Sequence, residues 1–355
     1  MTDKPFYGHI HYFRGISIIL IVAAHCWSMP LFLFADNNPS EDILSLHHVI
    51  ETLFHGSTVY FAMISGLLYS LVLKHKPYKS FIKTKFAHVF TPYIIASFCY
   101  LAMWELLGFI NPPDDVTALQ FFGVLSFVLL TGQMSMHLWY IPIIMLLFLI
   151  TPLLLRAVNA QRVIWFVILL LLPLVISRVW PNFHPATLVY FIGPYIAGLM
   201  IGQNLEKAED WIKERQWFFA ASFILFSASY YMLLANDVKF VSWGMLEVNA
   251  QETVTYLLRM SFAIVLLRVL HLTVQRVPVW IDYLAQNAFA IYFIHISIIM
   301  FLTNATIAYE LQPEGVLENF LFGLFTLIFS IVMSLGITWI LKKLTGRHSR
   351  KIIGA

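Results

Sequence analysis

The sequence predicts an all-α polytopic membrane protein, with about ten transmembrane helices in a single domain that covers residues 1–355. Three observations support this fold class. Hydrophobic residues make up 60% of the chain and charged residues only 12%, whereas soluble proteins average about 25% charged residues. The apolar residues gather in stretches of about 20, the length that crosses a bilayer as a helix. Lysine and arginine are concentrated in alternate loops, as the positive-inside rule requires.

Taken in order along the chain, the apolar stretches give the expected spans. These are 12–33, 53–73, 87–109, 137–155, 162–177, 187–203, 216–235, 252–271, 285–304 and 320–341, of which the fifth and sixth are short. The stretch 119–131 is too short to span comfortably, so we expect a re-entrant or interfacial helix there. Pro194, Gly198 and Gly202 recur every four positions in the sixth span, which predicts close packing between helices.

The basic residues predict the orientation in the membrane. With the N-terminus in the cytoplasm, all of the 22 Lys and Arg residues except Arg178, Lys239 and Arg259 fall in cytoplasmic segments. Counting 119–131 as a full span would invert everything after it and destroy this asymmetry. We therefore expect both termini to be cytoplasmic.

Several classes of function lack support in the sequence. The two cysteines, Cys26 and Cys99, lie in apolar stretches and do not indicate a disulfide framework or a metal site. No long basic run is interleaved with aromatic residues, so nucleic acid is not an expected partner. HExxH, P-loop, GxSxG and dinucleotide-binding motifs are absent. We therefore expect no metal and no nucleotide-hydrolase or serine-hydrolase chemistry.

The first span carries two ionisable residues, Arg14 and His25. Eleven helical steps of about 100° place them on one face, about 16 Å apart along the axis. Ionisable groups inside hydrocarbon are costly and therefore suggest a functional site. His25 is either a general base or a packing histidine. Arg14 is either a guanidinium that holds an anion or an anchor at the cytoplasmic headgroups.

The loop at residues 74–85, which includes Lys83 and Lys85, is the most basic in the chain. It either contacts anionic lipid or attracts a polyanionic cytoplasmic ligand such as coenzyme A.

Other polar or aromatic residues in the spans also have two interpretations. Ser65 beside Gly66 is typical of helix packing. Trp139 fits an interfacial aromatic belt, and it could also be a platform for a sugar ring. His295, which follows Tyr292 by three positions, is a second histidine at mid-membrane.

Six short segments occur in a fixed order along the chain. They are Arg14-x10-His25, Tyr60-Phe-Ala-Met-Ile-Ser65-Gly66, Phe90-Thr-Pro92-Tyr93, His137-Leu-Trp139-Tyr140, Phe191-Ile-Gly193 and Ile291-Tyr292-Phe-Ile-His295. In order and spacing they resemble the membrane-bound acyltransferase-3 family over essentially the whole chain. The chain departs from the family pattern by having Lys83, Lys85 and His88 where arginines are usual, and Ile296 in place of a proline.

The resemblance implies transfer of an acyl group, commonly acetyl, from cytoplasmic acyl-CoA to a hydroxyl of a carbohydrate. The acceptor would be a lipid-linked glycan or an envelope polysaccharide at a bacterial inner membrane. It also implies that His25 is the general base and that Arg14 positions the donor or supports the base. Further implied roles are coenzyme A contacts by Lys83 and Lys85, and a substrate cavity lined by Ser65, Trp139, Tyr292 and His295.

Two other classes of function remain open from the residues alone. A carrier or flippase for a polysaccharide or lipid-linked sugar would also use buried arginine, histidine and glutamate. A non-catalytic membrane scaffold would need neither Arg14 nor His25 beyond stability. Covalent transfer of label from acetyl-CoA to a glycan distinguishes the acyltransferase from both.

Overall fold

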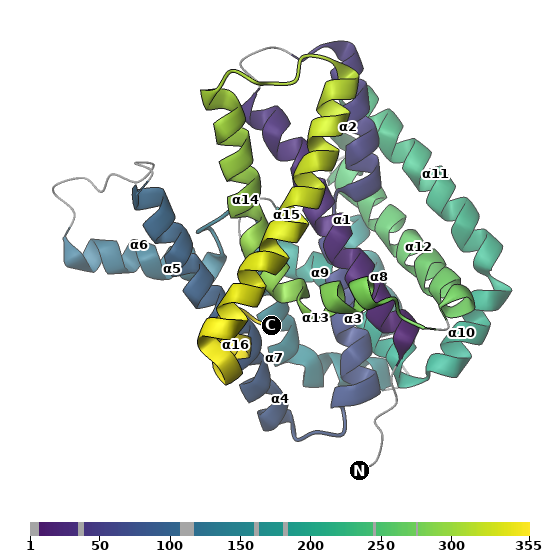
Figure 1. Ribbon diagram of the computed structural model, residues 1–355. Coiled ribbons are helices and arrows are strands. Elements are labelled where there is room, and N and C mark those ends of the chain that lie inside the picture. Colours follow the sequence, from purple (N-terminus) through teal and green to yellow (C-terminus); the bar gives the residue numbers. More distant parts are fainter. Residues whose placement is uncertain are drawn as a thin grey trace.

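The structure is a computed structural model that describes residues 7–34, 39–106, 117–159, 163–179, 184–243, 246–274 and 276–355. Within these ranges the chain is almost entirely helical, and most helices pack side by side in one bundle (Figure 1). Nine of the described helices are long and apolar enough to cross a membrane. The predicted all-α polytopic fold is therefore confirmed.

The helices follow one another with short connections. The first half of the chain contains α1 (Gly8–Leu33), α2 (Glu41–Phe54), α3 (Thr58–Leu68), η2 (Tyr69–Leu73), α4 (Tyr78–Lys85), η3 (Phe86–Phe90), α5 (Thr91–Leu106), α6 (Ala118–Thr131), α7 (Tyr140–Asn159) and α8 (Val163–Leu171). The second half contains η4 (Leu172–Leu174), α9 (Pro185–Gln203), α10 (Leu205–Glu214), α11 (Gln216–Ala235), α12 (Ala250–Thr273), α13 (Val279–Gln286), α14 (Ala288–Ala308), α15 (Val316–Thr345), η5 (Gly346–His348) and α16 (Ser349–Ile352). The start of α1 and the end of α15 lie at the same end of the bundle (Figure 1).

Two expected elements need comment. The stretch 119–131 forms α6, which begins with a Thr117–Gln120 capping box and lies across the direction of α15 (Figure 1). The expected span 162–177 is shorter than predicted, because α8 ends at Leu171 and a 3-10 turn containing Pro173 follows. Proline lacks the N–H that would continue the helix. Residues 107–109 and 162, at the ends of two expected spans, lie outside the described residues.

Small residues bring α3 and α9 into close contact. A Cβ on Gly198 would overlap the carbonyl oxygen of Met63, and a Cβ on Gly66 would overlap that of Tyr195. A Cβ on Gly202 would lie 2.5 Å from the carbonyl oxygen of Leu67. The predicted packing stripe on the sixth span is thus confirmed, and its partner is the helix that follows Ser57.

Arg259 of α12 holds the break between α2 and α3. Its side chain is 1% exposed and donates to backbone carbonyl oxygens at the end of α2. The acceptors are Glu51 (3.3 Å), Thr52 (2.7 Å), Leu53 (2.9 Å) and His55. The last carbonyls of a helix have no partner within it, so Arg259 supplies the missing donors. Arg259, which the sequence analysis sets apart from the cytoplasmic basic residues, therefore caps the end of α2.

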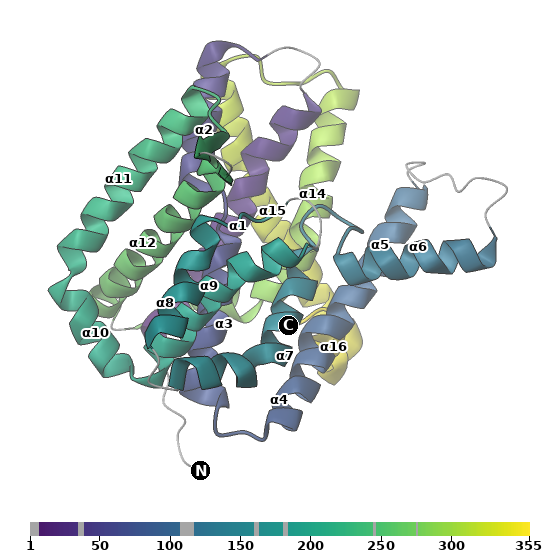
Figure 2. The same cartoon turned by 180° about the vertical axis from the view of Figure 1, so that it is seen from behind.

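A small antiparallel hairpin follows α11 and was not expected from the sequence. Its strands are β1 (Phe240–Trp243) and β2 (Leu246–Asn249), paired Phe240 with Asn249 and Ser242 with Glu247. The hairpin lies near the ends of α2 and α12 (Figure 2). It covers part of the cavity described next.

Candidate functional site

A cavity of about 770 Å³ lies between α1, the α2–α3 break, the segment before α7, the start of α12 and the hairpin. Three of the residues singled out in the sequence line it, namely His25, Trp139 and Tyr292. Arg14, Ser65, Lys83, Lys85 and His295 are not among the lining residues. The cavity is therefore built around the His25 end of α1.

His25 stands in front of two further histidines. The ring centres of His25 and His295 are 5.5 Å apart, and those of His295 and His137 are 5.1 Å apart. His295 Nδ1 lies 3.0 Å from the carbonyl oxygen of Ile291. A carbonyl can only accept, so this nitrogen carries the proton and Nε2 of a neutral His295 does not. His25 and His137 both line the cavity, whereas His295 is not among its lining residues.

Tyr292 fixes the position of His137. Its hydroxyl donates to the carbonyl oxygen of His137, and Ser135 Oγ lies 3.1 Å from Nδ1 of the same histidine. Trp139, two residues on, packs its ring against Phe191 at 5.7 Å. Trp139 is buried but lines the cavity, so only a small part of its side chain is available to a molecule there.

A carboxylate network also lines the cavity. Glu51 pairs with His55 (Oε2 to Nδ1, 2.7 Å) and accepts a hydrogen bond from Ser28. Glu51 and His55 both interact electrostatically with His25. Because Ser28 is one helical turn beyond His25, the network ties the carboxylate to the same face of α1.

Arg178 and Glu252 extend this network. Arg178 Nε donates to Glu252 Oε2 at 2.6 Å, and Arg178 also contacts His55. Burial disfavours the charge on Arg178, but the Glu252 carboxylate more than offsets this and raises the pKa of Arg178 above its usual value. Arg178 is therefore a permanent cation at the cavity wall, held by a partner of opposite charge.

A second cluster of charge lies at the other end of α1. Lys85 interacts electrostatically with Arg14 and Arg350, and His88 with Lys85, Arg350 and Lys351. The Arg14 guanidinium lies 5.7 Å from the centre of the Phe289 ring. Lys85 Nζ lies 4.4 Å from that of Phe148. Among the described residues, no carboxylate forms a salt bridge with Arg14, Lys85 or Arg350. We call Arg14, Lys85, His88 and Arg350 the basic cluster.

Two singled-out residues lie outside both regions. Lys83 is exposed on the surface of α4. Ser65 is half-buried on α3, beside the Gly66 contact with α9.

Comparison with known proteins decides the family. The family model described as acyltransferase domain, Acyl_transf_3, matches residues 7–339. The chain belongs to the acyltransferase-3 family. No curated protein and no solved structure matches this acyltransferase-3 chain.

Sequence reasoning missed several charged residues of this acyltransferase-3 chain. Glu51, His55 and Glu252 come together only through folding, because 197 residues or more separate Glu252 from the other two. One signal was present, however. Arg178 and Arg259 were exceptions to the charge asymmetry, and both turn out to be buried and paired. Arg178, a basic residue on the unexpected side of the membrane, was thus a marker of the cavity, whereas Arg259 caps α2.

Proposed function

We propose that this acyltransferase moves an acetyl group from cytoplasmic acetyl-CoA to a hydroxyl of a carbohydrate, with His25 as general base. The observation that carries the proposal is the layout of α1. His25 lines a cavity at one end, and Arg14 joins the basic cluster at the other. One helix thus links a polar chamber for an acceptor to an anion-binding region for a donor.

The basic cluster supports a phosphate-rich donor. Like charges that gather without carboxylate partners repel one another, and an anion relieves that repulsion. Arg14 and Arg350 carry guanidinium groups that can hold phosphate through two hydrogen bonds. The pyrophosphate and 3′-phosphate of coenzyme A fit this chemistry. Lys85 and Arg350 are the proposed contacts beside Arg14, and Lys83 is a more distant one.

The cavity supports a polar acceptor. Its volume of about 770 Å³ lies within the usual range for small-ligand sites, about 300–1,000 Å³. Histidine, serine and carboxylate groups from α1 and α2 offer hydrogen bonds to sugar hydroxyls, and Trp139 offers an apolar edge. These features favour a lipid-linked glycan or an envelope polysaccharide as acceptor.

The proposed reaction is a direct transfer. A ring nitrogen of His25 takes the proton of the acceptor hydroxyl while the hydroxyl oxygen attacks the thioester carbonyl carbon. The tetrahedral intermediate then expels the coenzyme A sulfur, which takes the proton back from His25. The products are an ester and free coenzyme A. Glu51, which interacts electrostatically with His25, stabilises the imidazolium that forms between the two steps.

The charge distribution sets the proposed orientation. The basic cluster faces the cytoplasm, where acetyl-CoA is available, and the cavity with His25 faces the opposite side. Both chain termini are then cytoplasmic. A bacterial inner membrane is the proposed location, because envelope glycans are assembled there.

Labelled acetyl-CoA tests transfer against transport. The purified protein is reconstituted in vesicles with an envelope glycan extract and acetyl-CoA that carries the label in its acetyl group. The proposal expects label on the glycan in an ester that mild base cleaves. A carrier or flippase would instead move glycan across the vesicle membrane and leave it unlabelled.

A further inference from the structure

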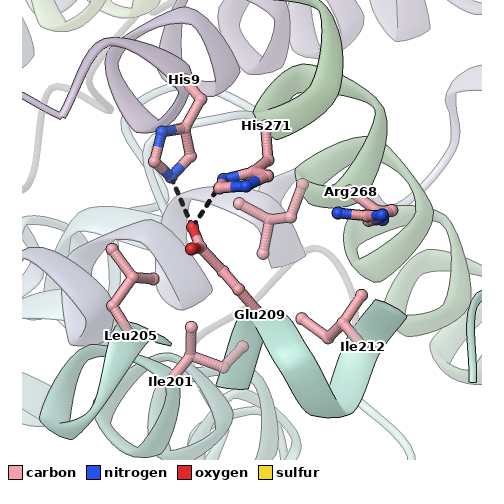
Figure 3. Close-up of a pocket in the computed structure, with 8 residues that line it drawn as sticks. His9, Ile201, Leu205, Glu209, Ile212, Arg268 and His271 are labelled. Carbon is pink, nitrogen blue, oxygen red and sulfur yellow. Dashed lines mark ion pairs between the residues drawn. The ribbon is translucent and has the colours of Figure 1, made fainter. Parts of the chain in front are cut away.

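A second cluster of ionisable side chains lies away from both the cavity and the basic cluster. His9 of α1, Glu209 of α10 and His271 of α12 meet on the flank of the bundle. They line a small pocket whose other walls are mainly aliphatic, from Ile201, Leu205, Ile212 and Leu267. Figure 3 shows both imidazole rings directed towards one carboxylate oxygen of Glu209.

The ligand atoms have the spacing of a metal site. His9 Nε2 lies 3.3 Å and His271 Nδ1 2.9 Å from Glu209 Oε1, and all three atoms lie within 4.8 Å of one another. Zinc bonds to nitrogen and oxygen of 2.0–2.1 Å at tetrahedral angles separate the ligand atoms by roughly 3.3 Å. Small shifts of the three side chains would therefore be enough to accommodate an ion.

An ordinary ion pair leaves part of this arrangement unexplained. The described residues offer no hydrogen-bond partner to the buried His9 Nε2, although this nitrogen lies 3.3 Å from Glu209 Oε1. A buried nitrogen without a partner is costly, and a metal ion would satisfy it. Arg268 also lines the pocket (Figure 3) and interacts electrostatically with Glu209, while its Nε donates to Gln216 Oε1 at 3.2 Å.

The size of the pocket limits the occupant. Its free volume of about 10 Å³ is about the space that one water molecule needs. Neither an organic ligand nor a phosphate would fit there. Two imidazole nitrogens and one carboxylate oxygen form a donor set used by zinc, with a fourth position open to water.

We propose that His9, Glu209 and His271 bind one divalent zinc-type cation that clamps the start of α1 to α10 and α12. His9 precedes Arg14 by five residues, so the ion fixes the end of the helix that carries the basic cluster. Since the three ligands are distant in sequence, no spacing motif could have revealed the site.

Metal binding to the purified protein tests this inference without any transferase assay. The protein carries a tag without histidine, is treated with a chelator, and is dialysed against micromolar Zn²⁺ before its metal content is measured. We expect one Zn²⁺ per chain. We also expect at least about tenfold weaker binding in His9→Ala and His271→Ala, because each removes a ligand. Metal content near zero in the wild-type protein would overturn the proposal.

Two further variants make the test specific. Glu209→Gln keeps the shape of the side chain but weakens its ligand oxygen, and it should also bind Zn²⁺ more weakly. His11→Ala is the matched control, because His11 lies on the same helix and pairs with a different carboxylate, that of Asp282, at 2.8 Å. It should bind Zn²⁺ as the wild type does. Equal binding by wild type, His9→Ala and His271→Ala would contradict the site, whatever their activity.

The absorption spectrum of bound Co²⁺ gives a second readout. It would not change in His271→Ala if His271 only supported the structure and bound no metal. Co²⁺ in place of Zn²⁺ should produce the visible absorption bands of a tetrahedral site in the wild-type protein. The bands should disappear in His271→Ala while gel-filtration elution stays the same. Identical spectra for the two proteins would overturn the assignment.

Discussion

The ring centres of His25 and His295 lie 5.5 Å apart, although the two residues come from α1 and α14. His295 is fully buried and bonded through Nδ1 to its own helix, whereas His25 is only half-buried and reaches the cavity. The two histidines therefore differ in their access to the cavity. In the proposed mechanism, His25 meets the substrate and His295 is the positioning residue behind it.

Replacing His295 should slow the reaction without weakening the binding of the acyl donor. In His295→Phe the ring volume is kept but the hydrogen bond to Ile291 is lost, so the support behind His25 shifts. We expect kcat to fall about 10- to 100-fold, as for other misplaced catalytic groups, with KM for acetyl-CoA unchanged. His295→Gln should retain more activity, because its amide can still donate. Steady-state kinetics check this, and an unaltered kcat in His295→Phe would contradict the positioning role.

Arg350 should contribute to donor binding. It comes from the last short helix, α16, which packs against α5 and η3 and brings it near Arg14 and Lys85. Arg350→Ala should raise KM for acetyl-CoA about tenfold, the scale of one lost hydrogen bond between charged groups. Lys79→Ala, an exposed cation on α4, serves as the control and should leave KM unchanged. Equal KM values for wild type and Arg350→Ala would remove Arg350 from the donor site.

Arg259 should matter for stability more than for chemistry. Arg259→Met removes the side-chain donors from the carbonyl oxygens of Thr52, Leu53 and His55, at a cost of about 2–4 kcal/mol in unfolding free energy. Arg259→Lys keeps the charge but cannot reach the same set of acceptors, so its loss should be intermediate. Thermal unfolding in detergent measures the order. The cap is refuted if Arg259→Met unfolds at the wild-type temperature.

The contact between α3 and α9 should tolerate no added carbon. Gly198→Ala places a methyl group against the carbonyl of Met63, so the helices must separate and the folded yield should drop sharply. Gly336→Ala is the matched control on α15, because nothing lies within 4 Å of the added carbon. It should fold normally and slightly stabilise its helix. Comparable yields for the two variants would show that the contact is loose.

The fold was predictable because hydropathy and charge act over whole segments. The spans, the short helix at 119–131 and the packing stripe at Gly198 all follow from patterns within about 30 residues of sequence. The shortening near Pro173 and the hairpin at 240–249 depend on local backbone chemistry that hydropathy does not report.

The candidate site could be predicted from the sequence only where its residues lie on one helix. Arg14 and His25 share a helix, so their spacing placed them on one face. Glu51, Arg178 and Glu252 belong to three separate segments, and so do His9, Glu209 and His271. Their meeting is a result of tertiary packing, and no short-range pattern encodes it.

The central claim is that His25 removes the proton from the acceptor hydroxyl. Its most direct test is the rate of acetyl transfer by His25→Ala in the labelled acetyl-CoA assay. His48→Ala, a histidine outside the cavity lining, serves as the control. We predict that His25→Ala keeps wild-type elution and thermal unfolding but loses about 10²- to 10⁴-fold in rate, while His48→Ala stays active. Transfer by His25→Ala at the wild-type rate would contradict the account.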